Sequence, residues 1–316
     1  MTPTPREDVR QLPDMNLIRS PLLIFGAPRS GTSMLFQALS THPALWSLYR
    51  ESQEIIEKHM YPALQRHDTD ELAAEDLSPQ DALDLVRSFY DRVGNAEASG
   101  AVNSKIPIIL RARLNKLLTL GSNGSKPPSI RMVEKNPQNS FRLPFLQRLF
   151  PDAHFLFISR APAANIASIY RGWHEPRFKT CTLPSGFVIP GYRTSSWSFG
   201  RPPGWRNMNG RSLIEICAFQ WRAYNEACLR DIPQLTQRVL RVRYEDLSEG
   251  PREVLAEIAE WADLDPRPLE RFADGLPVVN TWSRPRADKW RSLAPQIEEV
   301  LPSVRHTAET LGYSSS

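Results

Sequence analysis

A segment rich in glycine and hydroxyl side chains, GAPRSGTS at residues 26–33, has the residue types and spacing to bind an anion. It follows a short apolar run, Leu22–Phe25, and precedes a stretch with helical periodicity that runs from Thr32 to Ser40. Backbone N–H groups at a helix N-terminus lack intrahelical acceptors, and the helix dipole favours negative charge there. The segment is therefore predicted to bind a phosphate or sulfate group of a nucleotide.

The spacing of this segment is that of a nucleotide P-loop, except that Thr32 stands where the lysine belongs. The cation is instead Arg29, inside the loop. Kinases and NTPases use the lysine and magnesium to manage a multiply charged γ-phosphate. A sulfuryl group carries less charge, so an arginine that clamps the 5'-phosphate and the leaving oxygen would be enough. The loop favours sulfuryl transfer; a plain glycine turn that opens a buried helix is the alternative.

A second strand-to-helix junction begins with the apolar run AHFLFIS, Ala153–Ser159. Arg160 follows at once, and a helical stretch, Ala163–Tyr170, contains Ser168. The guanidinium fork matches phosphate geometry, and a serine can donate from the helix. In the alternative interpretation, Arg160 pairs with a nearby carboxylate and Ser168 is a packed small residue.

The two junctions together resemble those of sulfotransferases that use 3'-phosphoadenosine 5'-phosphosulfate (PAPS). GAPRSGTSML resembles their 5'-phosphosulfate loop, and its PRSGT form is similar to that of tyrosylprotein and many bacterial sulfotransferases. The resemblance implies that Arg160 and Ser168 hold the 3'-phosphate. It also implies that the 5'-phosphosulfate is bound by loop residues, namely Arg29, Ser30, Gly31, Thr32 and Ser33.

Two later segments extend the resemblance. RYEDL, at residues 243–247, resembles a family strand end, where we expect Tyr244 to pack and the carboxylates to order the junction. Lys289 and Trp290 resemble part of the loop that closes over the nucleotide, although the insert before them is longer than in the family. The other candidates in that insert for stacking and phosphate contacts are Trp282, Arg284 and Arg286. Adenine stacking stays open between Trp173, Trp282 and Trp290.

An acceptor hydroxyl needs a base as its oxygen attacks sulfur. The sequence VEKNP, at residues 133–137, lacks the histidine of the cytosolic relatives. In the PRSGT relatives a glutamate after the first helix is the base, and a lysine in a K-x-P element stabilises the leaving oxygen. Glu51 and Lys135 match these positions, with Glu54 as the alternative base. Arg29, Lys135 and Glu51 are thus the predicted catalytic residues, and no metal is required.

The fold predicted from these elements is α/β, a single P-loop-like domain with a central, mainly parallel sheet flanked by helices. We expect an N-terminal arm over residues 1–20 and the sulfotransferase domain over residues 21–316. Residues 173–209 are dense in Gly, Pro, Trp and Arg, so they are predicted to be a long excursion or lid without regular elements. Its aromatic residues could line the acceptor site or form a small core of their own. The other expected elements are strands at 130–134 and 239–243 and helices at 212–229 and 251–263.

Charge, apolar runs and cysteine content argue against some classes of protein. The 316 residues carry a formal charge of +4 without a dense basic run, which argues against nucleic-acid binding. The apolar runs are far shorter than the roughly 20 residues of a membrane span. A polar N-terminus and three cysteines without metal-ligand spacing favour a cytoplasmic protein.

The sequence thus predicts transfer of a sulfuryl group from PAPS to a hydroxyl or amine of a small-molecule, carbohydrate or lipid acceptor, with adenosine 3',5'-bisphosphate (PAP) as product. The acceptor's identity and the oligomeric state stay open, and a homodimer is possible. Two alternatives remain at this point: an ATP-dependent small-molecule kinase of the P-loop class, and a catalytically silent PAP-binding module.

Overall fold

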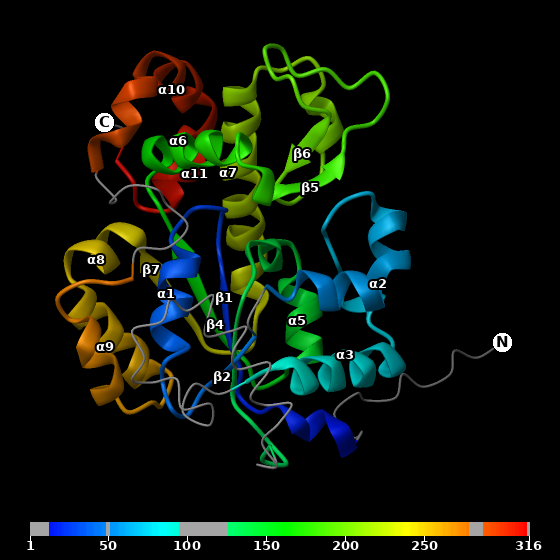
Figure 1. The fold of residues 1–316 in the computed structure, drawn as a ribbon, viewed down its shortest axis with the longest axis vertical. Coiled ribbons are helices and arrows are strands. Elements are labelled where there is room, and N and C mark those ends of the chain that lie inside the picture. Colours follow the sequence, from blue (N-terminus) through cyan, green and yellow to red (C-terminus); the bar gives the residue numbers. More distant parts are fainter. Residues whose placement is uncertain (1–12, 49–50, 95–125, 278–286, 315–316) are drawn as a thin grey trace.

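Among the residues that the structure describes, the central sheet has five parallel strands in the order β2-β3-β1-β4-β7 (Figure 1). The computed structural model describes residues 13–48, 51–94, 126–277 and 287–314. The strands are β1 (Leu22–Phe25), β2 (Trp46–Ser47), β3 (Met132–Lys135), β4 (His154–Ser159) and β7 (Val239–Arg243). The predicted fold class, with its parallel sheet between helices, is confirmed.

The residues of β1 face two apolar cores in alternation. In β1, Leu23 and Phe25 belong to a core shared with α2, α3 and α5, whereas Leu22 and Ile24 belong to a core shared with α1 and α9. Helices cover both faces of the sheet (Figure 1). Burial on both faces explains why β1, LLIF, is a continuous apolar run. The described helices are α1 (Thr32–Leu39), α2 (Gln53–His67), α3 (Pro79–Arg92), α5 (Leu143–Leu149), α6 (Pro162–Trp173), α7 (Leu213–Asp231), α8 (Tyr244–Glu249), α9 (Pro251–Trp261), α10 (Ala294–Val300) and α11 (Arg305–Thr310).

The excursion at residues 173–209 contains a small antiparallel sheet, so the expectation that it lacks regular elements was wrong. Strand β5 (Lys179–Thr182) pairs with β6 (Ser196–Ser198). The strands are short and most of β5 is exposed, so no apolar alternation marks them in the sequence. Burial of Trp197 holds the hairpin onto the domain.

The aromatic residues of the excursion form a core with α6 and α7. Trp173, Trp197 and Trp205 are all buried in it. The ring centroids of Trp173 and Trp197 are 5.0 Å apart in an edge-to-face arrangement, and those of Trp197 and Trp205 are 5.2 Å apart. These three rings therefore pack inside the excursion instead of lining an open surface.

A buried carboxylate joins the excursion to the segment after α2. The Asp70 carboxylate accepts from the Arg201 backbone N–H at 2.9 Å, and the Asp70 N–H donates to the Arg201 carbonyl at 3.0 Å. The Asp70 carbonyl in turn accepts from Nε of the buried Arg142 at 2.8 Å. This reciprocal bonding anchors the far part of the excursion to the rest of the domain.

The chain ends pack against this framework where they are described. From Pro13 a short 3₁₀ helix leads to Ile18, which forms a bridge with Ile130.

Cys181, Cys217 and Cys228 are free thiols, and two of them are buried. Of the helices that the structure describes, none has the length and apolarity to cross a membrane.

The backbone at Gly26, directly after β1, packs closely against β4. Its φ is +146°, and a Cβ built there would lie 2.1 Å from the Ile158 carbonyl oxygen. We expect Gly26→Ala to lower the free energy of unfolding by about 3 kcal/mol or more in urea denaturation, because backbone must move. Gly186→Ala is the control: φ is +79° but no atom lies within 4 Å, so it should cost about 1–2 kcal/mol. Equal losses would contradict the packing account.

Candidate active site

The loop between β1 and α1 has the tight geometry of an anion-binding turn. Arg29 and Gly31 both have positive φ, of 67° and 108°. Gly31 is the N-cap of α1 and makes no side-chain cap bond, so the first-turn N–H groups of the helix face the loop. Ser30 is fully buried, and its N–H donates to the Ala27 carbonyl at 3.1 Å. Of the predicted loop ligands, Ser30 and Thr32 are buried, whereas Arg29, Gly31 and Ser33 are partly exposed.

The junction between β4 and α6 lies directly against this loop. The Asn165 amide donates to the Pro28 carbonyl at 2.8 Å, and Arg160 Nη1 donates to the Arg29 carbonyl at 3.1 Å. Arg29 Nε lies 3.4 Å from Ser168 Oγ. The structure thus brings Arg29, Arg160 and Ser168 together, as a shared nucleotide site would require.

The residues after β7 pack between the two junctions. The Tyr244 ring lies 2.6 Å from where a Cβ on Gly31 would be, and Arg160 Cζ lies 4.0 Å from the centroid of the same ring. Glu245 accepts from the Ala161 N–H at 3.0 Å and from the Tyr313 hydroxyl at 3.2 Å. Tyr244 and Glu245 therefore order both junctions, as expected for the RYEDL segment.

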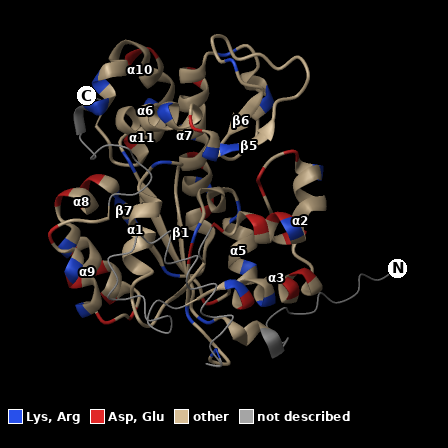
Figure 2. Ribbon diagram, viewed as in Figure 1, with Lys and Arg blue, Asp and Glu red and all other residues tan. Residues whose placement is uncertain are grey.

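Both arginines at this site are largely buried. Burial lowers the pKa of Arg29 to about 10, an effect that Glu175 opposes and that Arg177 and Arg160 reinforce. Burial likewise lowers the pKa of Arg160, whose buried Nε has no partner among the described residues. Elsewhere, surface helices such as α3 and α9 carry both acidic and basic residues (Figure 2). A bound anion would satisfy the Arg160 donor and offset the cost of burying these cations.

The predicted base and lysine form an ion pair at the end of the neighbouring strand. Lys135 ends β3 opposite Ile24 of β1, and its Nζ donates to a carboxylate oxygen of Glu51. The Lys135 side chain is 7% exposed and that of Glu51 45% exposed, so a ligand could reach the carboxylate from solvent. Glu54 is exposed, and Glu51 is the acid that pairs with Lys135.

A second acid lies beneath this pair. Glu134 is 2% exposed and accepts from the Asn139 amide at 2.7 Å. Burial raises its pKa to about 7, although Ser52 and Asn139 act in the opposite direction. Ser52 Oγ also accepts from Asn136 Nδ2 at 3.1 Å. Ser52, the residue after Glu51, is therefore hydrogen-bonded to residues at the end of β3.

The C-terminal candidates lie along α6. The Lys289 carbonyl and Ser292 Oγ both accept from Arg171, and Trp290 packs against the core of α6 and α7. Trp173 is fully buried, and its Nε1 donates to Gln220 at 2.8 Å, so its ring cannot stack on adenine. The remaining candidates of this segment lie outside the described residues: Trp282, Arg284 and Arg286.

Three residues at the site were missed from sequence. Asn165 is a fully buried polar residue within an otherwise apolar helix stretch, AANIAS, and that mismatch was the available signal. Glu134 is likewise a charged residue inside a buried strand. Glu175 follows α6 and reaches Arg29 only through tertiary folding, which no local pattern predicts. Within the described ranges, no three His, Cys, Asp or Glu residues are grouped to hold a metal.

Comparison with known proteins supplies the family. A family model described as "Sulfotransferase family" matches residues 21–185, just over half of the chain. The chain belongs to the sulfotransferase family. The matched region of this sulfotransferase includes both junctions and the Glu51–Lys135 pair.

Several solved structures resemble this sulfotransferase over most of its length. A sulfotransferase domain from the curacin biosynthetic pathway is 17% identical and has a TM-score of 0.46, with 94% of this chain and 99% of that chain covered. The sulfotransferase domain of the Synechococcus PCC 7002 olefin synthase is 22% identical at a TM-score of 0.46, covering 94% and 97%. A sulfotransferase from Mycobacterium avium is 16% identical at a TM-score of 0.49, covering 97% and 79%. A search of curated proteins found no match.

The raised pKa of Glu134 predicts a pH-dependent cost. Its folded-state pKa of about 7 lies above the ordinary value of 4.5, so stability falls as pH rises through this range. Glu134→Gln mimics the protonated acid, so the variant should not lose this stability as pH rises. We expect the difference in unfolding free energy, variant minus wild type, to increase by on the order of 2–3 kcal/mol between about pH 5 and about pH 8 in urea denaturation.

The exposed Glu257 of α9 provides the control. Glu257→Gln should change stability by less than about 0.5 kcal/mol at both pH values. A difference between Glu134→Gln and wild type that is the same at both pH values would contradict the assignment.

Proposed function

We propose that this protein transfers a sulfuryl group from PAPS to a hydroxyl or amine of a small-molecule, carbohydrate or lipid acceptor. The observation that carries the proposal is the contact between the two strand-to-helix junctions, where Arg29, Arg160 and Ser168 converge. A nucleotide with phosphate groups at both the 3' and 5' positions of one ribose offers two anions at a short, fixed separation. Its chemistry matches two adjacent cationic junctions better than that of a nucleotide with one phosphate chain.

The loop after β1 would hold the 5' end. Arg29 supplies a charged fork, and the N–H groups of the first turn of α1 supply neutral donors from Gly31 to Ser33. Arg160 and Ser168 would hold the 3'-phosphate, and the Nε of Arg160, which has no partner in the described part of the chain, is one donor for it. Lys289 and Trp290 would contribute from the segment along α6.

PAPS, when bound, supplies an electrophilic sulfur and a leaving group, PAP. The Glu51 carboxylate would take the proton of the acceptor hydroxyl as the new oxygen–sulfur bond forms. Lys135 and Arg29 would donate to the bridging oxygen, on which negative charge grows as the old bond breaks. The Glu51–Lys135 ion pair places the proposed base beside the lysine that would donate to the bridging oxygen.

Thermal shift with two nucleotides tests the proposal. A ligand that binds only the folded protein raises the melting temperature, and saturating PAP at about 100 times its Kd would add about 2.7 kcal/mol of stability. We expect PAP to raise the melting temperature and ATP with magnesium to leave it nearly unchanged. The reverse result would favour the kinase class and contradict the proposal.

Glu51→Gln tests the base. We expect this variant to bind PAP with wild-type affinity in calorimetry but to lose about 10²- to 10⁴-fold in kcat, because the amide cannot take the proton. Turnover would be measured with labelled PAPS and an acceptor identified by screening hydroxyl and amine compounds.

Glu54→Gln is the matched control, since Glu54 is exposed and lies three residues further along the chain, in the first turn of α2. It should leave both affinity and turnover unchanged. If Glu51→Gln kept full turnover while Glu54→Gln lost it, Glu54 would be the base instead.

A further inference from the structure

The ring of Phe178 links the excursion to the loop arginine. Phe178 ends a short 3₁₀ turn, Pro176–Phe178, directly after α6. Arg29 Cζ lies 5.1 Å from the centroid of the Phe178 ring, and Arg177 Cζ lies 4.8 Å from it. Arg29 thus meets an aromatic face that comes from outside the nucleotide loop.

The excursion fixes the position of this ring. Phe178 stacks on Phe199 with centroids 4.9 Å apart and an interplanar angle of 28°, and the Phe178 carbonyl accepts from the Phe199 N–H at 2.8 Å. Thr180 Oγ1 donates to the Phe199 carbonyl at 2.7 Å. Gly172 leaves room for Phe199, because a Cβ there would lie 2.6 Å from its ring. Phe178 is therefore held between α6 and the β5–β6 hairpin.

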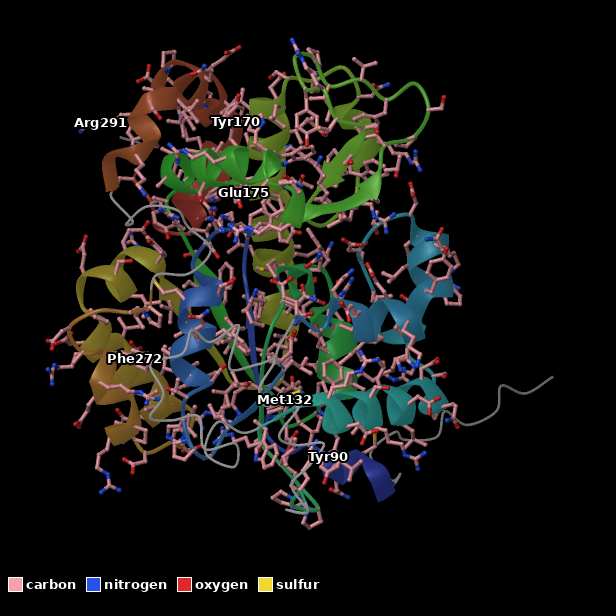
Figure 3. The ribbon with its side chains drawn as sticks, in the orientation of Figure 1. Tyr90, Met132, Tyr170, Glu175, Phe272 and Arg291 are labelled. Atoms are coloured by element: carbon pink, nitrogen blue, oxygen red, sulfur yellow. The ribbon has the colours of Figure 1, made fainter. Side chains whose placement is uncertain are left out.

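The Phe178 ring lies against the Arg29 guanidinium, which is largely removed from solvent. Burial lowers its pKa, and attraction between a cation and an aromatic face is strongest where the cation is desolvated. Glu175 supplies opposite charge, and Figure 3 places it where α6 ends, near the carboxyl end of β1. Glu175 is also paired with Arg177, which is exposed and lies on the same ring. Phe178 is thus the apolar surface around which these three charges are arranged.

We propose that Phe178 is a positioning residue that orients the Arg29 guanidinium toward the 5'-phosphosulfate. This inference rests on the proposed function. Its consequence is that the excursion also completes the nucleotide site. Correct packing of the excursion would then be required for productive binding of the sulfuryl donor.

A double-mutant cycle on PAP affinity tests this inference without an acceptor. Calorimetry at one salt concentration would compare wild type, Phe178→Leu, Arg29→Ala and the double variant. We expect Phe178→Leu to weaken PAP binding by about 5- to 30-fold, equivalent to about 1–2 kcal/mol. In the Arg29→Ala background the same change should alter affinity by less than about 2-fold, because Phe178 acts through Arg29.

Two further variants separate positioning from packing. Phe178→Tyr keeps the ring face and should restore PAP affinity to within about 2-fold of wild type. Phe187→Leu removes another excursion ring, one that stacks on Trp205 at 5.7 Å, and should leave PAP affinity unchanged. Unfolding midpoints of all variants would establish that each is folded at the temperature of the titration.

The outcomes are distinguishable. If wild type binds PAP and Phe178→Leu binds it equally well, the positioning role is wrong and the proposed function stands. The same holds if Phe178→Leu loses as much affinity in the Arg29→Ala background as in wild type. If wild type itself gives no heat with PAP, the proposed function fails, and the inference fails with it.

Discussion

The parallel pairing of β1 and β4 at the centre of the sheet is the constraint on which the site depends. Phe25 of β1 is in register with Phe157 of β4, so both strands deliver their following loops to the same edge. Tyr244, from the end of β7, then packs between Gly31 and Arg160 and sets how closely the two junctions approach. Because parallel strands all end at one edge, three separate segments of the chain can build a single anion site there.

This arrangement concentrates buried positive charge. Two guanidinium groups lie together, and burial lowers the pKa of each, which is a cost to the folded protein in the absence of an anion. The excursion offsets part of that cost through Glu175 and through the ring of Phe178. We therefore expect anion binding to stabilise the fold at this edge of the sheet, because poorly compensated groups often gather at functional sites.

Much of this could be predicted from the sequence, because buried parallel strands and glycines with positive φ leave local signals. Strands β1 and β7 have the predicted bounds, and Arg29, Arg160 and Ser168 converge. The β5–β6 hairpin and the two-residue β2 were missed, since short or exposed strands carry no apolar alternation. Asn165 and Phe178 were missed because only tertiary packing decides which carbonyl or cation they meet. Trp173 was among the candidates for stacking on adenine, but its ring is fully buried in the α6–α7 core and cannot contact a nucleotide.

The most direct measurement compares the affinities of PAP and adenosine 5'-monophosphate for wild type and for Arg160→Gln. If the two junctions hold opposite ends of one nucleotide, wild type should bind PAP at least about 10-fold more tightly, because charged hydrogen bonds to the 3'-phosphate are added. Arg160→Gln should lose that preference and keep its affinity for the monophosphate within about 2-fold. Equal binding of both ligands by wild type, or an equal loss of both in Arg160→Gln, would contradict the account.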